Sequence, residues 1–149
     1  MNYSLNLLKI LGTNIARELL NEKRTPEERL FQAIILQAFE DALNMGEHKH
    51  DAYCKQDSYN WFTNDTKNFN DICWFANFEP EIIRGKFNEL ISIKQITYTK
   101  VQLKWLRYRW LYKEYRDSED KAQRRKILKE IKSIEGIKKA PKVNKKKHK

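Results

Sequence analysis

The sequence predicts an all-α protein, and three observations support that prediction. Charged residues make up 34% of the 149 residues, and there are only four glycines and three prolines, a composition typical of helices. No run of alternating Val, Ile and Thr is bounded by Asn-Gly or Asp-Gly turns, so strand signals are nearly absent. Apolar residues, 40% of the chain, recur instead at helical spacing. They are enough for one modest core with appendages.

The first expected element is an amphipathic helix within residues 1–24. Leu8, Leu11, Ile15 and Leu19 fall at helical spacing, so one helix is expected from about residue 4 to about residue 21. Gly12 is a weak point within it, because glycine disfavours helix interiors.

A helical core is expected over residues 25–97. Thr25, Pro26 and Glu28 form a helix-start signature, since the threonine hydroxyl and the glutamate carboxylate can each accept a backbone N–H of the other. The helix that follows should end near Gly46, and another is expected over residues 51–62. The first of these helices has a broad apolar face that we expect to be buried: Leu30, Phe31, Ile34, Ile35, Ala38, Phe39, Ala42 and Leu43.

The stretch 69–90, "FNDICWFANFEPEIIRGKFNEL", predicts a helix-turn-helix-like corner. Asn77 falls where a left-handed backbone is needed, Pro80 begins the second helix, and Cys73 provides the small side chain where the helices approach. The apolar positions that a typical unit buries are occupied by Ile72, Ala76, Phe78 and Ile83, and Phe87 and Leu90 extend that stripe.

The segment Asp57–Arg84, "DSYNWFTNDTKNFNDICWFANFEPEIIR", resembles small, poorly characterised helix-turn-helix proteins of bacteria and phage or prophage. The resemblance covers about residues 25–90 and rests on a Trp-Phe pair, a short capped turn and a Cys-containing helix, turn and Pro-initiated helix that ends in Arg. It implies a DNA-binding regulator, and it implies no catalytic residue.

The second helix of this corner allows two interpretations. Arg84 and Asn88 could read guanine and adenine, with Lys86 as a helper. However, three glutamates outnumber the two cations between residues 79 and 89, which is unfavourable beside phosphates. Arg84 could instead pair with Glu81 or with an acid of another helix, in which case the corner is structural or binds protein.

The positive charge of the chain is concentrated in a basic aromatic arm over residues 98–137 and a basic tail, expected to be disordered, over 138–149. Residues 1–97 have a net charge of −3, residues 98–149 have +13, and the whole chain has +10. This asymmetry favours a polyanionic partner. The cations of the arm that we expect to bind nucleic acid are Lys100, Lys104, Arg107, Arg109, Lys113, Arg116, Arg124 and Arg125.

The arm is either one long helix or a pair broken near "RDSED", with Asp117 or Ser118 as a cap and Gly136 at its end. Its aromatic residues could pack inside or stack on unpaired bases. After Ser118 a narrow stripe remains for a helical hairpin or a partner helix, namely Ile127, Leu128, Ile131 and Ile134.

Other kinds of chemistry have little support in the sequence. Two cysteines cannot form a disulfide framework, and no secretory signal or membrane-length apolar run is present, so a cytoplasmic protein is expected. His48 and His50 lie too close together for two ordinary zinc ligands on a helix, and no Cys-x-x-Cys pair accompanies them. No phosphate loop or nucleophile motif occurs, so neither an enzyme nor a cofactor is expected.

We therefore expect a nucleic-acid-binding protein, with DNA favoured over RNA, that regulates transcription through the corner and the arm. Two alternatives remain open. One is an adaptor for RNA polymerase, a ribosome or a partner helix, including self-association through the C-terminal helices. The other is an RNA or single-strand binder that uses the arm alone.

Overall fold

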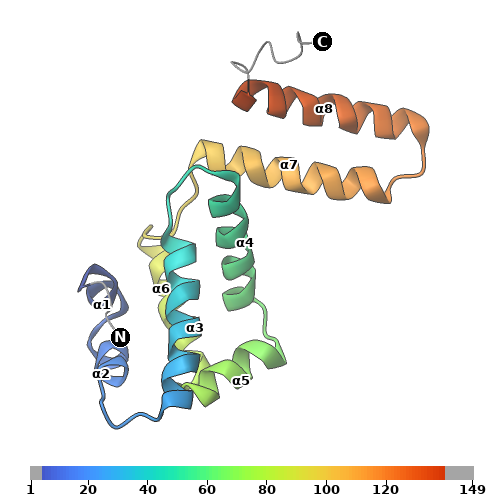
Figure 1. Cartoon of the computed structure of the whole chain (residues 1–149). Coiled ribbons are helices and arrows are strands. Elements are labelled where there is room, and N and C mark those ends of the chain that lie inside the picture. Colours follow the sequence, from blue (N-terminus) through green and yellow to red (C-terminus); the bar gives the residue numbers. More distant parts are fainter. Residues whose placement is uncertain (1–4, 140–149) are drawn as a thin grey trace, which may run out of the picture. The chain divides into compact units, whose positions relative to one another are not determined.

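The computed structural model describes residues 5–139, with side chains over 6–135, and these residues form helices without any strand. This confirms the all-α prediction. The chain divides into two compact units between Tyr98 and Thr99. The first unit contains α1 (Leu5–Leu11), α2 (Thr13–Leu19), α3 (Pro26–Leu43), α4 (Lys49–Thr63), α5 (Lys67–Phe75) and α6 (Pro80–Ser92), and the second contains α7 (Lys100–Asp117) and α8 (Lys121–Lys139) (Figure 1).

The N-terminal segment forms two short helices, so the prediction of a single helix there is wrong. Gly12 separates α1 from α2 with a φ of +91°, a left-handed backbone that favours glycine. Its amide still donates to the Leu8 carbonyl at 3.1 Å, and its carbonyl accepts from the Ala16 amide at 3.0 Å. The chain therefore bends at Gly12 while keeping most of its hydrogen bonds.

Helix α3 begins as predicted, and it buries part of the expected apolar face, namely Ile35, Phe39 and Ala42. The Thr25 hydroxyl accepts from the Glu28 amide at 3.1 Å, and the Glu28 carboxylate accepts from the Thr25 amide at 3.0 Å. Leu30 and Ile34, expected to be buried, are exposed, whereas Gln32 and Leu36 are buried. The Gln32 amide donates to the Ala76 carbonyl at 3.0 Å, where α5 ends.

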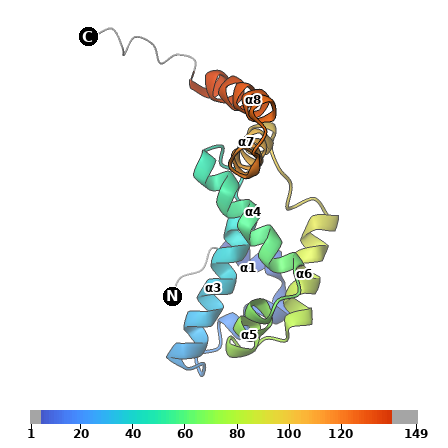
Figure 2. The same ribbon diagram turned by 90° about the vertical axis from the view of Figure 1, so that its right-hand side faces the viewer.

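An aromatic cluster forms the centre of the first unit. Phe62 of α4 stacks on Phe87 of α6 with ring centroids 4.2 Å apart, and Phe39 of α3 lies 4.5 Å from Phe62. Tyr59 meets Phe87 edge to face at 5.4 Å. All three phenylalanines are fully buried, so these contacts join three helices around one core. Figure 2 shows α3, α4 and α6 running beside one another.

The segment between α5 and α6 has the backbone features that the sequence predicts. Thr66 begins α5 by accepting from the Phe69 amide at 3.2 Å. Asn77 has a φ of 69°, the left-handed conformation expected of it, and Pro80 begins α6. The Phe78 amide donates to the Cys73 carbonyl at 2.9 Å, which closes the turn. The side chains of Cys73 and Phe78 are both buried.

Lys55 of α4 is fully buried and holds the end of the first unit in place. Its Nζ donates to the Asn44 carbonyl at 2.9 Å and to the Thr97 carbonyl, and it lies 5.0 Å from the centre of the Tyr98 ring. Burial lowers the pKa of the Lys55 ammonium group to about 8. One buried cation thus joins the loop before α4 to the segment that leads into α7.

The second unit is a hairpin of α7 and α8, one of the two forms expected of the arm. The break lies at residues 118–120, and Asp120 caps α8 by accepting from the Ala122 amide at 3.2 Å. The predicted caps, Asp117 and Ser118, instead end α7. Helix α8 continues through Gly136 to Lys139, so Gly136 does not end it. Residues 140–149 of the predicted tail lie outside the described residues.

The hairpin has a narrow apolar core. Leu111 of α7 is buried, and so are the isoleucines of α8 at positions 127, 131 and 134. The predicted isoleucine stripe of α8 is therefore used mainly within the hairpin. Leu128, the fourth member of that stripe, is only partly buried.

Candidate nucleic-acid interface

Arg84, the predicted base reader of α6, is occupied by contacts within the first unit. Its Nη1 lies 3.2 Å from Glu81 Oε2, its Nη2 lies 3.6 Å from Asp65 Oδ1, and its Nε donates to the Phe62 carbonyl at 3.4 Å. The guanidinium also lies 4.6 Å from the centre of the Phe69 ring. Only 16% of the side chain is exposed. These contacts join α6 to the end of α4 and the start of α5.

We expect Arg84→Ala to lower the free energy of unfolding by about 1–2 kcal/mol, because it removes a partly buried cation–π contact and a backbone hydrogen bond. Chemical denaturation measures this loss. Arg125→Ala, at an exposed site on α8, is the control and should leave stability nearly unchanged. An Arg84→Ala protein of normal stability that has lost sequence preference for DNA would restore the role of Arg84 as a base reader.

The exposed face of α6 is acidic and apolar. Lys86 is 18% exposed, and its Nζ bonds to Glu89 Oε1 at 3.0 Å. Asn88 is exposed, and so are Glu81, Glu89 and Ile82. Carboxylates on an exposed helix face repel phosphates, so α6 is poorly suited to enter a major groove.

The two helices of the hairpin present two different faces to solvent. One buried residue and one ion-paired residue on each helix define the directions of these faces. Tyr108 and Ile131 point into the hairpin, since both are buried and the Tyr108 hydroxyl bonds to Glu135 of α8. Positions that directly precede and follow such a residue project to opposite sides, about 100° from it. Arg107 and Glu130 meet on one side, so Arg109 and Lys132 project on the other.

The first of these faces, called here the paired face, carries an ion pair between the two helices. Arg107 donates to Glu130 Oε2 at 3.1 and 2.9 Å from its Nε and Nη2, and its guanidinium lies 4.9 Å from the centre of the Trp110 ring. These residues line a pocket of about 220 Å³ together with Glu114 and Lys126. The lining of this pocket thus contains two cations and two carboxylates, and Arg107 and Glu130 form an ion pair across it.

The second face, called here the basic face, carries almost only cations. Helical spacing of i, i+4 and i+7 puts three on α7, and spacing of i, i+4, i+8 and i+11 puts four on α8. They are Arg109, Lys113, Arg116, Lys121, Arg125, Lys129 and Lys132. Among the described carboxylates of the two helices, Asp117 pairs with Lys113 at 3.7 Å and Glu135 bonds to Tyr108 at 2.6 Å. The basic face therefore has a clear excess of positive charge.

The structure divides the cations predicted for the arm. Arg109, Lys113, Arg116 and Arg125 lie on the basic face. Arg107 lies on the paired face, and helical spacing of i, i+4 and i+7 puts the exposed Lys100 and Lys104 on the same side of α7, near its start. Arg124 packs over the Tyr115 ring at 4.4 Å. The basic face also includes three lysines that were not among the expected site residues, Lys121, Lys129 and Lys132, and their helical spacing with Arg125 is the signal that could have identified them.

Most aromatic residues of α7 pack inward. Trp105 and Tyr108 are buried and meet edge to face at 5.2 Å, and Tyr112 lies 5.1 Å from Tyr108. Burial and the hydrogen bond to Glu135 raise the pKa of the Tyr108 hydroxyl. Trp110 is exposed, but it lies on the paired face under Arg107. The basic face therefore offers charge and few rings for base stacking.

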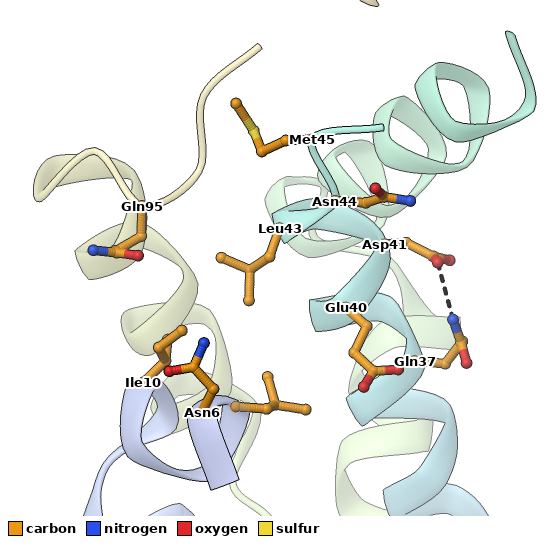
Figure 3. Close-up of a pocket in the computed structure, with 10 residues that line it drawn as sticks. Asn6, Ile10, Gln37, Glu40, Asp41, Leu43, Asn44, Met45 and Gln95 are labelled. Carbon is orange, nitrogen blue, oxygen red and sulfur yellow. Dashed lines mark hydrogen bonds between the residues drawn. The ribbon is translucent and has the colours of Figure 1, made fainter. Parts of the chain in front are cut away.

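A second concave site lies in the first unit between α1 and α3 (Figure 3). It measures about 620 Å³ and is lined by Asn6, Ile10, Glu40, Leu43 and Gln95 among others. Gln37 donates to Asp41 at 2.9 Å on its rim. Its lining contains carboxylates and amides but no cation, thiol or imidazole, so it offers no nucleophile–base pair.

Two further features of the described residues bear on function. His50 Nε2 and Cys54 Sγ are 3.4 Å apart on α4, and no cluster of three or more potential metal ligands occurs in the described part of the chain. No helix between residues 5 and 139 combines the length and the apolar character needed to cross a membrane.

Comparisons of the chain with protein-family models, with curated proteins and with solved structures gave no match. The resemblance to small helix-turn-helix proteins therefore stays a prediction. The class that the described residues define is an all-α protein with a helical core and a basic helical hairpin.

Proposed function

We propose that this protein binds nucleic acid by its phosphate backbone, through the basic face of the α7–α8 hairpin. The observation that carries the proposal is the separation of charge across the hairpin. Arg107 and Glu130 neutralise each other on the paired face, while seven cations project from the basic face. Such a stripe releases condensed counterions when it neutralises phosphates, and this release drives association.

Duplex DNA is the ligand that we favour. Proteins that hold single strands combine positive charge with exposed aromatic rings on which bases stack. Here Trp105 and Tyr108 are buried, and Trp110 lies on the paired face. A surface of cations with few such rings suits the continuous phosphate backbone of a duplex, and DNA is favoured over RNA as in the sequence-based expectation.

Base reading by α6 is not part of the proposal. Arg84 and Lys86 are both engaged by glutamates, and the exposed face of α6 carries Glu81 and Glu89. Asn88 alone remains in a position to contact a base edge. We therefore propose binding with little sequence preference, so a regulatory role would depend on a partner rather than on a base-reading helix.

We expect the full chain to bind duplex DNA more tightly than single strands or RNA, and residues 1–98 to lose most of that affinity. The remaining unit has a net negative charge, since residues 1–97 carry −3 and Tyr98 adds none. Fluorescence anisotropy with the three ligands at equal length and equal salt measures this. A 1–98 protein that binds as tightly as the full chain would contradict the proposal and move the binding site into the first unit.

A further inference from the structure

Helix α3 exposes apolar side chains that its amphipathic pattern would bury. Leu30 is 60% exposed and Ile34 is 39% exposed. Phe75, at the end of α5, is 54% exposed and packs against Phe31 with ring centroids 5.1 Å apart. A contiguous apolar surface of this kind commonly marks a binding site, whereas isolated exposed apolar residues need no explanation.

Ile34, one of these exposed side chains, also lines a groove, called here the α3 groove, that runs between α3 and the helices α4 and α5. Ile34 and Ala38 form its α3 wall, and Trp61 and Ile72 form part of the opposite wall. Its volume is about 400 Å³. From Ile34 to Asp41 the α3 wall extends about 10 Å, or two helical turns, which is the length over which a bound helix presents anchors at i, i+4 and i+7.

The charges in the groove favour a basic occupant. Asp41 of α3 and Asp57 of α4 line it, and no Lys or Arg does so. The nearest described cation on α5 is Lys67, whose Nζ is held by Asp71 Oδ2 at 2.6 Å. Carboxylates at the rim of an apolar groove attract a cationic partner and repel an anionic one.

We propose that the α3 groove binds a basic amphipathic helix of a partner protein. Two or three apolar residues of that helix pack against Ile34, Ala38 and Ile72, and its lysines or arginines meet Asp41 and Asp57. This site lies in the first unit and is separate from the basic face, so it does not depend on the proposed nucleic-acid binding. The protein would then hold a nucleic acid with its hairpin and a protein helix with its core.

Two synthetic helical peptides of about 18 residues, or five turns, test the proposal. Both have leucines at i, i+4 and i+7, and one carries lysines on its polar face where the other carries glutamates. We expect the full chain to bind the basic peptide at least tenfold more tightly than the acidic one in isothermal titration calorimetry. Equal binding of the two peptides, or binding of neither, would overturn the proposal.

Two variants of the full chain locate the binding. Ile34→Asp should weaken binding of the basic peptide at least tenfold, because it puts a hydrated charge where an apolar anchor of the peptide would pack. Leu103→Asp on α7, which changes an exposed apolar residue outside the groove, should leave the affinity for the basic peptide unchanged. Asp57→Lys should reduce the preference for the basic peptide without removing an apolar contact. Unchanged binding by Ile34→Asp would show that the peptide binds elsewhere and would refute the proposal.

Thiol reactivity gives a second readout. Cys54 lines the groove and is half-buried, whereas Cys73 is fully buried and burial raises its pKa to about 12. The Cys54 thiol should therefore react quickly with an aromatic disulfide, whereas the Cys73 thiol should not. The basic peptide should slow the reaction of Cys54. If the bound peptide does not change the reaction rate of Cys54, the peptide binds outside the groove.

Sedimentation of the free protein distinguishes a second copy from a partner helix. We expect the same oligomeric state for the unmodified chain and for Ile34→Asp. A dimer that Ile34→Asp dissociates would mean that the groove is covered by another copy of this chain, which would also overturn the proposal.

Discussion

A triple substitution on the basic face, Lys113→Gln, Arg116→Gln and Arg125→Gln, is expected to weaken binding to duplex DNA by about a hundredfold at physiological salt. Each of these exposed cations can neutralise one phosphate, and the three lie on both helices of the hairpin. Loss of three such contacts, at about 1 kcal/mol each, gives this factor. Fluorescence anisotropy with a duplex of random sequence measures it.

The matched control removes the same charge elsewhere on the hairpin. Lys100→Gln, Lys104→Gln and Lys126→Gln should weaken binding far less, since Lys126 lines the pocket of the paired face and the other two lie near the start of α7. All six residues are exposed, so neither variant should change the helical circular dichroism. Equal losses from the two variants would mean that only net charge matters and that the basic face is not a binding surface.

The second large effect concerns Lys55 and the pH dependence of stability. Because the pKa of Lys55 falls from 10.5 in the unfolded chain to about 8 in the folded protein, the unfolded chain binds more protons between these values. The free energy of unfolding therefore gains a term that rises with pH from about 8 to about 10.5. Below pH 8 the cost of burying the charge is present in full, and the rise amounts to about 3 kcal/mol.

Comparison with Lys55→Met isolates this term, because the other titrating groups are common to both proteins. Tyr98 is one of them, since burial raises its pKa to about 12. Urea denaturation from pH 7 to pH 10 should show the unmodified protein gaining stability relative to Lys55→Met as the pH rises. Parallel curves would contradict the prediction and indicate that the Lys55 ammonium group titrates near its ordinary pKa.

The elements that could be predicted from sequence are those set by local chemistry. Thr25 and Glu28 cap α3 through hydrogen bonds between residues three apart, and Pro26 fits the first helical position. Asn77 adopts a left-handed backbone because its short polar side chain tolerates it. The charge asymmetry from which the basic arm was predicted is likewise a property of the composition.

The parts that could not be predicted depend on tertiary contacts. Hydrophobic spacing marked Leu30 and Ile34 of α3 as core, but the position of α5 decides which side of α3 is covered, and Gln32 is buried instead because it reaches the Ala76 carbonyl. Arg84 shows the same limit for the candidate site. Its contacts with Phe62 and Asp65 come from the end of α4 and the connection that follows it, and the sequence around Arg84 does not specify where these lie.

The candidate interface was predicted in part for a related reason. The cations of the arm were evident from the sequence, but its two faces were not. They follow from the break at residues 118–120, which folds α8 back on α7 and brings Glu130 to Arg107. Until that pairing is known, Arg107 and Arg109 look equivalent.

The salt dependence of DNA binding by the full chain tests the central claim most directly. If the basic face neutralises about five phosphates, the logarithm of the association constant should fall against the logarithm of salt concentration with a slope of about −4 to −5. The triple variant at positions 113, 116 and 125 should reduce the magnitude of that slope by about 3. A slope shallower than about −1, or one that the triple variant leaves unchanged, would contradict phosphate binding through the basic face.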